Sequence, residues 1–214
     1  MTTPTSPRRP RKDATANRAV ILAAAADTIS RDPHASLDTI ARNAGLTRRA
    51  LYGHFDDRDA LVRETLRVGT ARFNLIADRV DTAEPAPLAL ARLTAMLWHE
   101  AAHIQLAAAL ALDDAHVEET AQALAPLRQR LLMVVTAGQQ RDELRTDIPA
   151  ATLARLIEET ARTVVARLDT TSPDAASLAV RAVLSIAGLG WRDAAALLTS
   201  HPELVELAQR GDGS

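Results

Sequence analysis

The sequence lacks cysteine, contains few aromatic residues and has no long uninterrupted apolar run. With no cysteine among 214 residues, disulfides, thiolate zinc sites and cysteine nucleophiles are excluded, and a reducing cytoplasm is the expected compartment. Aromatic residues make up 2% and glycine occurs eight times, whereas apolar residues, mostly alanine and leucine, make up 47%. This composition favours helices over strands. No apolar run approaches the roughly 18 residues of a membrane span. We therefore expect an all-α cytoplasmic protein with no membrane partner.

The net charge of −2 conceals an uneven distribution along the chain. Residues 1–60 hold ten Lys or Arg against seven Asp, whereas residues 61–214 hold fifteen Arg against twenty Asp or Glu. Basic charge concentrated in one part of a chain is typical of an anionic partner such as nucleic acid.

The residue pattern of the N-terminal part predicts a basic arm followed by three helices. Residues 1–13 combine three prolines with Ser, Thr and Arg, which predicts a disordered arm. Residues 14–31 follow a helical pattern, with a buried stripe expected around Val20, Leu22, Ala24 and Ile29. Residues 36–45 begin at a serine cap and end at a glycine, and a third helix follows from a threonine cap over 47–54. Two short helices joined by a tight glycine turn indicate a helix-turn-helix within a first domain of residues 14–60.

The remainder, residues 61–214, predicts a second helical domain. Its prolines stand where helices begin or end, and the apolar pattern places helices near 58–79, 86–111, 113–123, 127–140, 150–168, 174–189 and 191–208.

The side chains of the helix-turn-helix suit the reading of double-stranded DNA, in which the second helix enters the major groove. Apolar contacts between the helices are expected from Leu37, Ile40, Ala41, Leu46, Leu51 and Phe55. The outer face then carries Arg48, Arg49, Ala50 and Gly53; arginine can bind guanine in a bidentate manner, and alanine can contact a thymine methyl. Donors suited to phosphates stand at the helix starts and flanks, at Ser36, Thr47, Tyr52, His54 and Arg58. The alternative is an amphipathic hairpin with a solvated arginine pair.

The same segment resembles the N-terminal signature of TetR-type regulators. The resemblance rests on Ile40-Ala41, Ala44-Gly45-Leu46-Thr47, Leu51-Tyr52, His54-Phe55, Asp57-Arg58-Asp59 and Leu61, and covers about fifty residues. It implies a homodimer that binds a palindromic operator, usually as a repressor, and is released by a small-molecule inducer bound in a divergent C-terminal domain. It also implies that the helices at 150–168 and 174–189 form the dimer interface. The sequence departs from the family at Arg49, where a small residue is common, and at Asp32-Pro33, which replaces the usual glycine.

A second motif, His99-Glu100-x-x-His103, matches the pattern in which two histidines bind zinc and the glutamate activates water. No third ligand stands at a family spacing, so a zinc-dependent hydrolase is a remote alternative. We expect no catalytic residues, no metal and no cofactor.

The helix at 86–111 is apolar on nearly all faces and predicts a buried helix that lines a ligand pocket. The residues expected to line it are Phe73, Met96, Trp98, His99, His103 and Met133. The alternatives are that the histidines only pack in the core, or that they bind a regulatory metal. A regulator that binds DNA but no small molecule also stays open.

Overall fold

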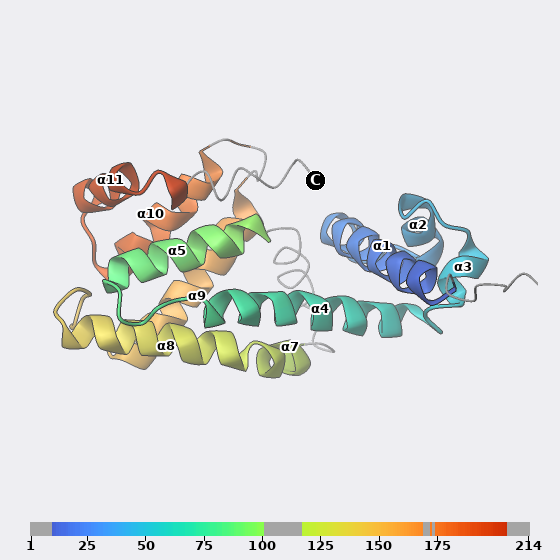
Figure 1. Cartoon of the computed structure of the whole chain (residues 1–214). Helices are drawn as coiled ribbons and strands as arrows, with labels where there is room; N and C mark the ends of the chain where they lie inside the picture. The colour runs from blue at the N-terminus through green and yellow to red at the C-terminus, as the bar shows by residue number, and fades with distance from the viewer. Residues whose placement is uncertain (1–9, 101–116, 169–171, 173, 205–214) are drawn as a thin grey trace, which may run out of the picture. The chain divides into compact units, whose positions relative to one another are not determined.

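A computed structural model describes residues 10–100, 117–168, 172 and 174–204, and all the regular structure in these ranges is α-helical (Figure 1). The prediction of an all-α fold is therefore confirmed for the described residues. The helices are α1 (Pro10–Arg31), α2 (Leu37–Asn43), α3 (Arg48–Tyr52), α4 (Arg58–Asp78), α5 (Ala86–His99), α7 (Val117–Ala123), α8 (Ala125–Gln140), α9 (Ala150–Arg167), α10 (Ala175–Ala187) and α11 (Trp191–Ser200).

The chain divides into two compact units, Met1–Arg67 and Val68–Ser214. The division falls inside α4, so the first half of this helix belongs to unit 1 and the second half to unit 2. The boundary expected from the sequence, between residues 60 and 61, lies in the same helix.

In unit 1, α1 begins at Pro10, four residues before the start expected from the sequence. Proline is tolerated at the first position of a helix because its missing N–H has no partner there in any case. The expected buried position at Val20 is wrong, since this side chain is 49% exposed, whereas Ile21 and Ile29 are fully buried. Leu22 and Ile29 are buried as expected, and Ile21 takes the buried position expected for Val20 because it faces the other helices of the unit.

The turn between α2 and α3 depends on capping and on one glycine. Ser36 Oγ accepts a hydrogen bond from the Thr39 amide at 3.2 Å, and Thr47 Oγ1 accepts one from the Ala50 amide at 3.2 Å. Gly45 has a φ of 68°, which is a left-handed conformation that side chains with a Cβ disfavour. These three residues fix where each helix starts and how sharply the chain turns between them.

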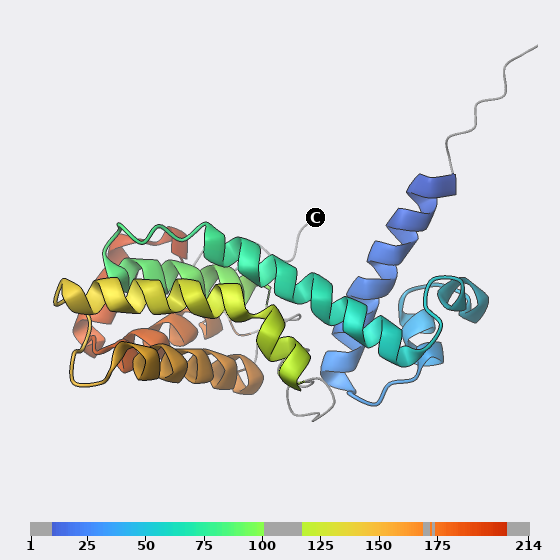
Figure 2. The same cartoon turned by 90° about the horizontal axis from the view of Figure 1, so that it is seen from below.

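In unit 2, α10 packs against both α5 and α9, and α8 packs against the same two helices (Figures 1 and 2). Leu90, Val135, Leu153 and Leu184, one from each of these helices, are almost fully buried in one core. Gly138 permits the close approach of α8 to α5, because a Cβ at this position would lie 2.5 Å from Ala86 Cβ. None of the described helices combines the length and the apolarity needed to cross a bilayer.

Several helices of unit 2 differ in extent from the sequence prediction. The helix expected over 86–111 is described as α5 up to His99, and residues 101–116 lie outside the described part of the chain. The helix expected over 191–208 ends at Ser200, because Pro202 disfavours helical backbone at the preceding His201. Pro126 stands in the first turn of α8, so it begins this helix rather than interrupting it.

Candidate functional site

The helix-turn-helix of unit 1 presents two capping hydroxyl groups at the starts of α2 and α3. Ser36 and Thr47 are both exposed, and each uses an oxygen lone pair to accept the hydrogen bond that caps its helix. A hydroxyl that accepts a capping bond still has its O–H to donate. Thr47 can therefore cap its helix and donate to a phosphate oxygen at the same time. Ser36 can do the same when the Thr39 hydroxyl donates in the 3.1 Å hydrogen bond between these two side chains.

The two arginines at the start of α3 differ in their surroundings. Arg48 Nη1 lies 3.0 Å from Asp38 Oδ2, and the Arg48 guanidinium stands 5.3 Å from the centre of the Tyr52 ring. The Arg49 side chain is exposed and makes no hydrogen bond or ion pair with any residue that the structure describes. Arg49 can therefore bind a ligand without breaking an internal contact. Arg48 must either break its ion pair with Asp38 or bind the ligand while that ion pair is kept.

Ala50, Gly53 and Tyr52 complete the outer face of α3. Tyr52 and Gly53 are exposed and Ala50 is partly exposed. Ala50 carries only a methyl group and Gly53 has no side chain, so neither residue extends far from the surface of the helix. This face can accept the edge of a base pair or of another planar group.

Arg58 has a structural contact that the sequence did not predict. Its Nε donates to the Ala35 carbonyl at 3.1 Å, and its Nη2 donates to the Pro33 carbonyl. These bonds hold the loop between α1 and α2, whose geometry the sequence left open. The contact with phosphate expected for Arg58 remains a prediction, and only the part of the guanidinium that faces away from this loop can make it.

His54 and Phe55 are held by Arg18 of α1. The Arg18 guanidinium stacks 4.5 Å from the centre of the buried Phe55 ring, and its Nη1 donates to the His54 carbonyl at 3.4 Å. His54 is partly exposed, which leaves its imidazole accessible. The stacking fixes the end of the helix-turn-helix against α1.

Arg18 also reaches Glu64 on α4, where a charged cluster joins the first and fourth helices of unit 1. Arg67 Nε donates to Glu64 Oε2 at 2.7 Å, and Arg18 Nη2 lies 3.1 Å from Glu64 Oε1. The hydrogen bonds from Arg67, together with those from Arg18, lower the pKa of Glu64 from 4.5 to about 2. The ionised carboxylate is therefore more stable in the folded than in the unfolded chain.

We expect Glu64→Gln to lower the free energy of unfolding of unit 1 by about 1–2 kcal/mol at pH 7, allowing for solvent screening around exposed Arg67. Because the folded pKa is depressed, this contribution is fully present above about pH 4.5 and disappears as the pH falls towards about 2. Urea titrations followed by far-UV circular dichroism at pH 7, 4 and 2.5 measure the difference between wild type and variant.

Asp59→Asn is the matched control on the same helix. Asp59 pairs with Arg63 four residues along α4, and both side chains are about half exposed. Such a pair contributes less than about 0.5 kcal/mol. Equal losses at pH 7 for Glu64→Gln and Asp59→Asn would contradict the assigned role of Glu64.

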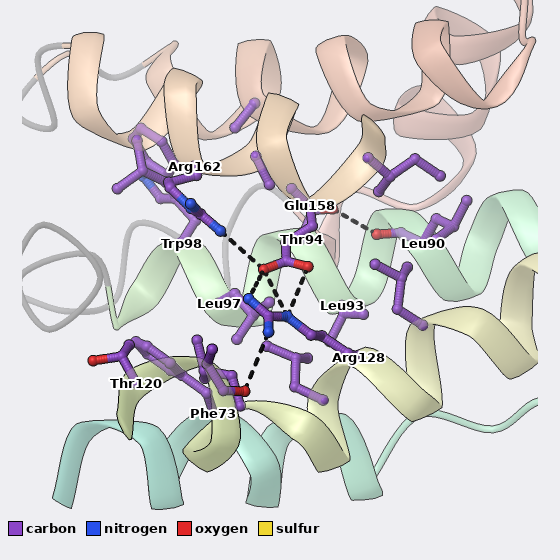
Figure 3. Close-up of a pocket in the computed structure, with 18 residues that line it drawn as sticks. Phe73, Leu90, Leu93, Thr94, Leu97, Trp98, Thr120, Arg128, Glu158 and Arg162 are labelled. Atoms are coloured by element: carbon purple, nitrogen blue, oxygen red, sulfur yellow. Dashed lines mark hydrogen bonds and ion pairs between the residues drawn. The ribbon is translucent and has the colours of Figure 1, made fainter. Parts of the chain in front are cut away.

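Unit 2 contains a cavity of about 200 Å³ that is lined mainly by α5, α8 and α9 (Figure 3). Its wall is mostly apolar, with side chains that include Phe73, Leu93, Leu97, Trp98, Ile157 and Val165. A mostly apolar cavity with a few polar groups is the usual form of a small-molecule site.

The polar part of the cavity wall is a cluster of three charged side chains from α8 and α9. Arg128 Nη2 donates to Glu158 Oε1 at 2.8 Å, and Arg162 Nη2 donates to the same oxygen at 2.9 Å. Figure 3 shows the Glu158 carboxylate between the two guanidinium groups. Thr120 also belongs to the wall; its side chain is buried, and its Oγ1 has no hydrogen-bond partner among the described residues.

The structure brings together only some of the side chains expected to line a pocket. Phe73 and Trp98 belong to the cavity wall. Met96, His99 and Met133 do not, and the last two are exposed to solvent. His103 lies outside the described residues.

The His99-Glu100-x-x-His103 motif does not form a described metal site. His99 is the exposed last residue of α5, and Glu100 Oε2 lies 3.2 Å from Arg72 Nη1 in an ion pair. Within the described residues, no three His, Asp or Glu side chains are placed to hold a metal ion.

The N-terminal helices match a known family. The model of the tetR family of bacterial regulatory proteins matches residues 21–65, from the middle of α1 into α4. The helix-turn-helix of this chain is a TetR-type DNA-binding domain. The resemblance inferred from the sequence is thereby confirmed. No curated protein matches the sequence of the chain.

Solved structures of TetR-type regulators share the fold over most of this chain. A TetR regulatory protein from Mycobacterium vanbaalenii is 28% identical, with a TM-score of 0.52, over 72% of this chain and 96% of that one. A γ-butyrolactone receptor described as ArpA-like is 19% identical, with a TM-score of 0.67, over 91% and 98%. CprB from S. coelicolor A3(2) is 21% identical, with a TM-score of 0.64, over 92% and 99%.

The sequence did not indicate the charged cluster or the partner of Arg48. Glu158 and Arg162 are spaced by four residues on α9. This spacing predicts that they share one face of the helix, but it does not predict that this face lines a cavity. Arg128 lies thirty residues earlier, and only the packing of α8 on α9 brings it to Glu158. Asp38 reaches Arg48 across the turn between α2 and α3.

Proposed function

We propose that this regulator binds a palindromic operator as a homodimer, represses transcription from the cytoplasm and is released by a small-molecule inducer. The proposal assigns base contacts to Arg48, Arg49, Ala50 and Gly53, and phosphate contacts to Ser36, Thr47, Tyr52, His54 and Arg58. It assigns the inducer to the cavity of unit 2. No enzymatic step is assigned to any residue.

The observation that carries the DNA-binding assignment is the exposed face of α3 on a firmly held turn. Arg49 is unpaired among the described residues, while the capping bonds of Ser36 and Thr47 and the bonds of Arg58 fix the backbone around it. Because the backbone of the turn is already held, binding to a base edge must order only the Arg49 side chain, so more of the contact energy is retained.

The dimer assignment is supported by apolar side chains that the single chain leaves exposed on α9 and α10. Leu156 is 41% exposed and Leu178 is 47% exposed, although both belong to strongly amphipathic helices whose other faces are buried. A second copy of the chain would bury them, and two-fold symmetry would present two α3 helices to one operator.

We expect the double substitution Leu156→Glu and Leu178→Glu to produce a monomer at micromolar concentration, because unpaired carboxylates at an interface oppose association. Light scattering after size-exclusion chromatography measures the mass of wild type and variant. Leu75→Glu is the matched control, since Leu75 is exposed on α4, outside the proposed interface. A monomeric wild type would contradict both the dimer and the palindrome.

The ligand assignment is supported by the apolar cavity and by the name of one structural neighbour. This neighbour has the same fold, and its name describes it as a receptor for γ-butyrolactone, which is a small organic molecule. The cavity in this chain lies between helices and has a mostly apolar wall.

The experiment that tests the function is selection of bound duplexes from random DNA by the full chain. We expect an inverted repeat whose half-sites are about 34 Å apart, or a multiple of that distance, since each α3 must enter a major groove. A reporter carrying the selected site is then expected to lose expression when the protein is present. Failure to enrich any sequence, in a sample that is folded and dimeric, would overturn the DNA-binding assignment of α3.

A further inference from the structure

The cavity wall in unit 2 has a marked division between apolar and charged parts. Its apolar side chains come from several helices, whereas all its charge comes from Arg128, Glu158 and Arg162 (Figure 3). An apolar molecule without a polar group would leave these three side chains without a function in binding. The charged cluster therefore indicates that the ligand carries a polar or charged group.

The charge of the cluster does not balance. Arg128 forms a bidentate pair with Glu158, through Nε at 3.0 Å from Oε2 and Nη2 at 2.8 Å from Oε1. Arg162 adds a second guanidinium, whose Nη2 lies 2.9 Å from the same Oε1. Two cations on one carboxylate leave one positive charge in excess at the cavity wall.

Glu159 offsets this excess only from the solvent side. Its Oε2 lies 3.6 Å from Arg162 Nη1, but its side chain is 49% exposed. Water screens a pair at this exposure strongly. The described side chains of the cavity wall therefore carry one positive charge in excess, which favours an anionic group near Arg162.

A purely structural role explains the cluster less well. One bidentate pair between Arg128 and Glu158 already joins α8 to α9, and Arg162 adds a second cation whose further carboxylate partner, Glu159, lies on the solvent side of the wall. An anionic ligand group supplies a partner on the cavity side.

The exposure of the two arginines indicates where the charged end of a ligand lies. The side chains of Arg162 and Arg128 are 35% and 39% exposed, and with Glu158 they also line an outer groove between α8 and α9. A charged group placed here keeps part of its hydration, which avoids most of the cost of burying an ion. The apolar body then fills the cavity beyond, towards Leu93 and Trp98.

We propose that the inducer of this regulator is a small amphipathic molecule with an aliphatic body and one anionic end group, held by Arg162 beside the Arg128–Glu158 pair. This proposal rests on the assignment of the cavity as the inducer site. The cavity of about 200 Å³ is below the roughly 300–1,000 Å³ of sites for drug-sized ligands, so the aliphatic body is short.

The test compares three probes that share one aliphatic body: octanoic acid, octan-1-ol and octylamine. Isothermal titration at pH 7, below the concentrations at which they aggregate, measures their binding to the full chain. We expect the ionised acid to bind at least about 10-fold more tightly than the alcohol, because charge-assisted hydrogen bonds are stronger than neutral ones. The amine, a cation at this pH, is expected to bind more weakly than the alcohol.

Arg162→Gln is the variant that tests the residue. We expect it to weaken binding of the acid about 10-fold and to leave binding of the alcohol within about 2-fold, because only the acid uses the charge. Arg155→Gln is the matched control, since Arg155 lies on the same helix and lines the outer groove but not the cavity. It is expected to leave both affinities unchanged.

The outcomes separate this proposal from the wider function. Equal binding of acid and alcohol by the wild type, or an acid preference that survives Arg162→Gln, overturns the anionic ligand. No binding of any probe by the wild type overturns it as well. If octan-1-ol releases a selected operator as effectively as the acid does, the assignment of the inducer site stands and only the proposed preference for an anion is overturned. If Arg162→Gln fails to fold, the comparison of the three probes on the wild type decides alone.

Discussion

Arg49→Ala is expected to lower affinity for the selected operator about 10- to 100-fold and to relax the base preference at one position of each half-site. The Arg49 side chain is exposed and unpaired among the described residues, so its removal costs the folded chain little. The loss therefore reports on the contact with DNA. Gel-shift titrations against a panel of operators with single base changes measure both effects.

Tyr52→Phe is the comparison for Arg49→Ala. It removes one exposed hydroxyl, which lies 3.5 Å from Arg48 Nη2, and keeps the ring that stacks on Arg48. A lost phosphate contact weakens binding to all sequences by a similar factor and leaves base preference unchanged. If Arg49→Ala also weakens every operator equally, Arg49 contacts the backbone of DNA and not a base.

The second large effect is expected for Leu51→Ala in α3. Leu51 is fully buried, and removing its side chain is expected to lower the free energy of unfolding of unit 1 by about 2–5 kcal/mol. This is a large part of the roughly 5–15 kcal/mol that stabilises a typical domain. DNA binding should be strongly reduced, because α3 then loses the packing that positions Arg48 and Arg49.

The tryptophans allow the two units to be followed separately during this measurement. Trp98 and Trp191 both belong to unit 2, whereas far-UV circular dichroism reports helices in both units. We expect Leu51→Ala to move only part of the dichroism transition to lower urea and to leave the tryptophan midpoint unchanged. Val20→Ala, at a 49% exposed position of unit 1, is the matched control and should change stability by less than about 0.5 kcal/mol. A similar loss in both variants would contradict the placement of Leu51 in the core.

The burial in α1 illustrates what a helical pattern can and cannot specify. The pattern identified α1 as a helix with a buried side, but several alanines next to Val20, Ile21 and Leu22 make more than one stripe consistent with it. Contact with the neighbouring helices selected Ile21 and excluded Val20. Such a choice depends on residues distant in the sequence, so a local pattern does not contain it.

The functional regions differ in the same way. The caps at Ser36 and Thr47, the turn at Gly45 and the exposed arginines of α3 all lie within one short segment, and their spacing predicted this arrangement. The cavity, in contrast, is assembled from α4, α5, α7, α8, α9 and α10. Phe73 and Trp98 were expected in its wall, but Arg128, Glu158 and Arg162 were not.

The sequence by itself determined an all-helical chain, its helix-turn-helix and the family that this segment matches, because caps, glycine turns and helical spacing act over a few residues. Only the tertiary structure decided that Arg58 holds the loop at Pro33 and that Arg67 and Arg18 lower the pKa of Glu64. It also decided that two arginines share one carboxylate beside an apolar cavity. Each of these requires packing of distant segments, since a side chain's charge state and contacts depend on its neighbours in space.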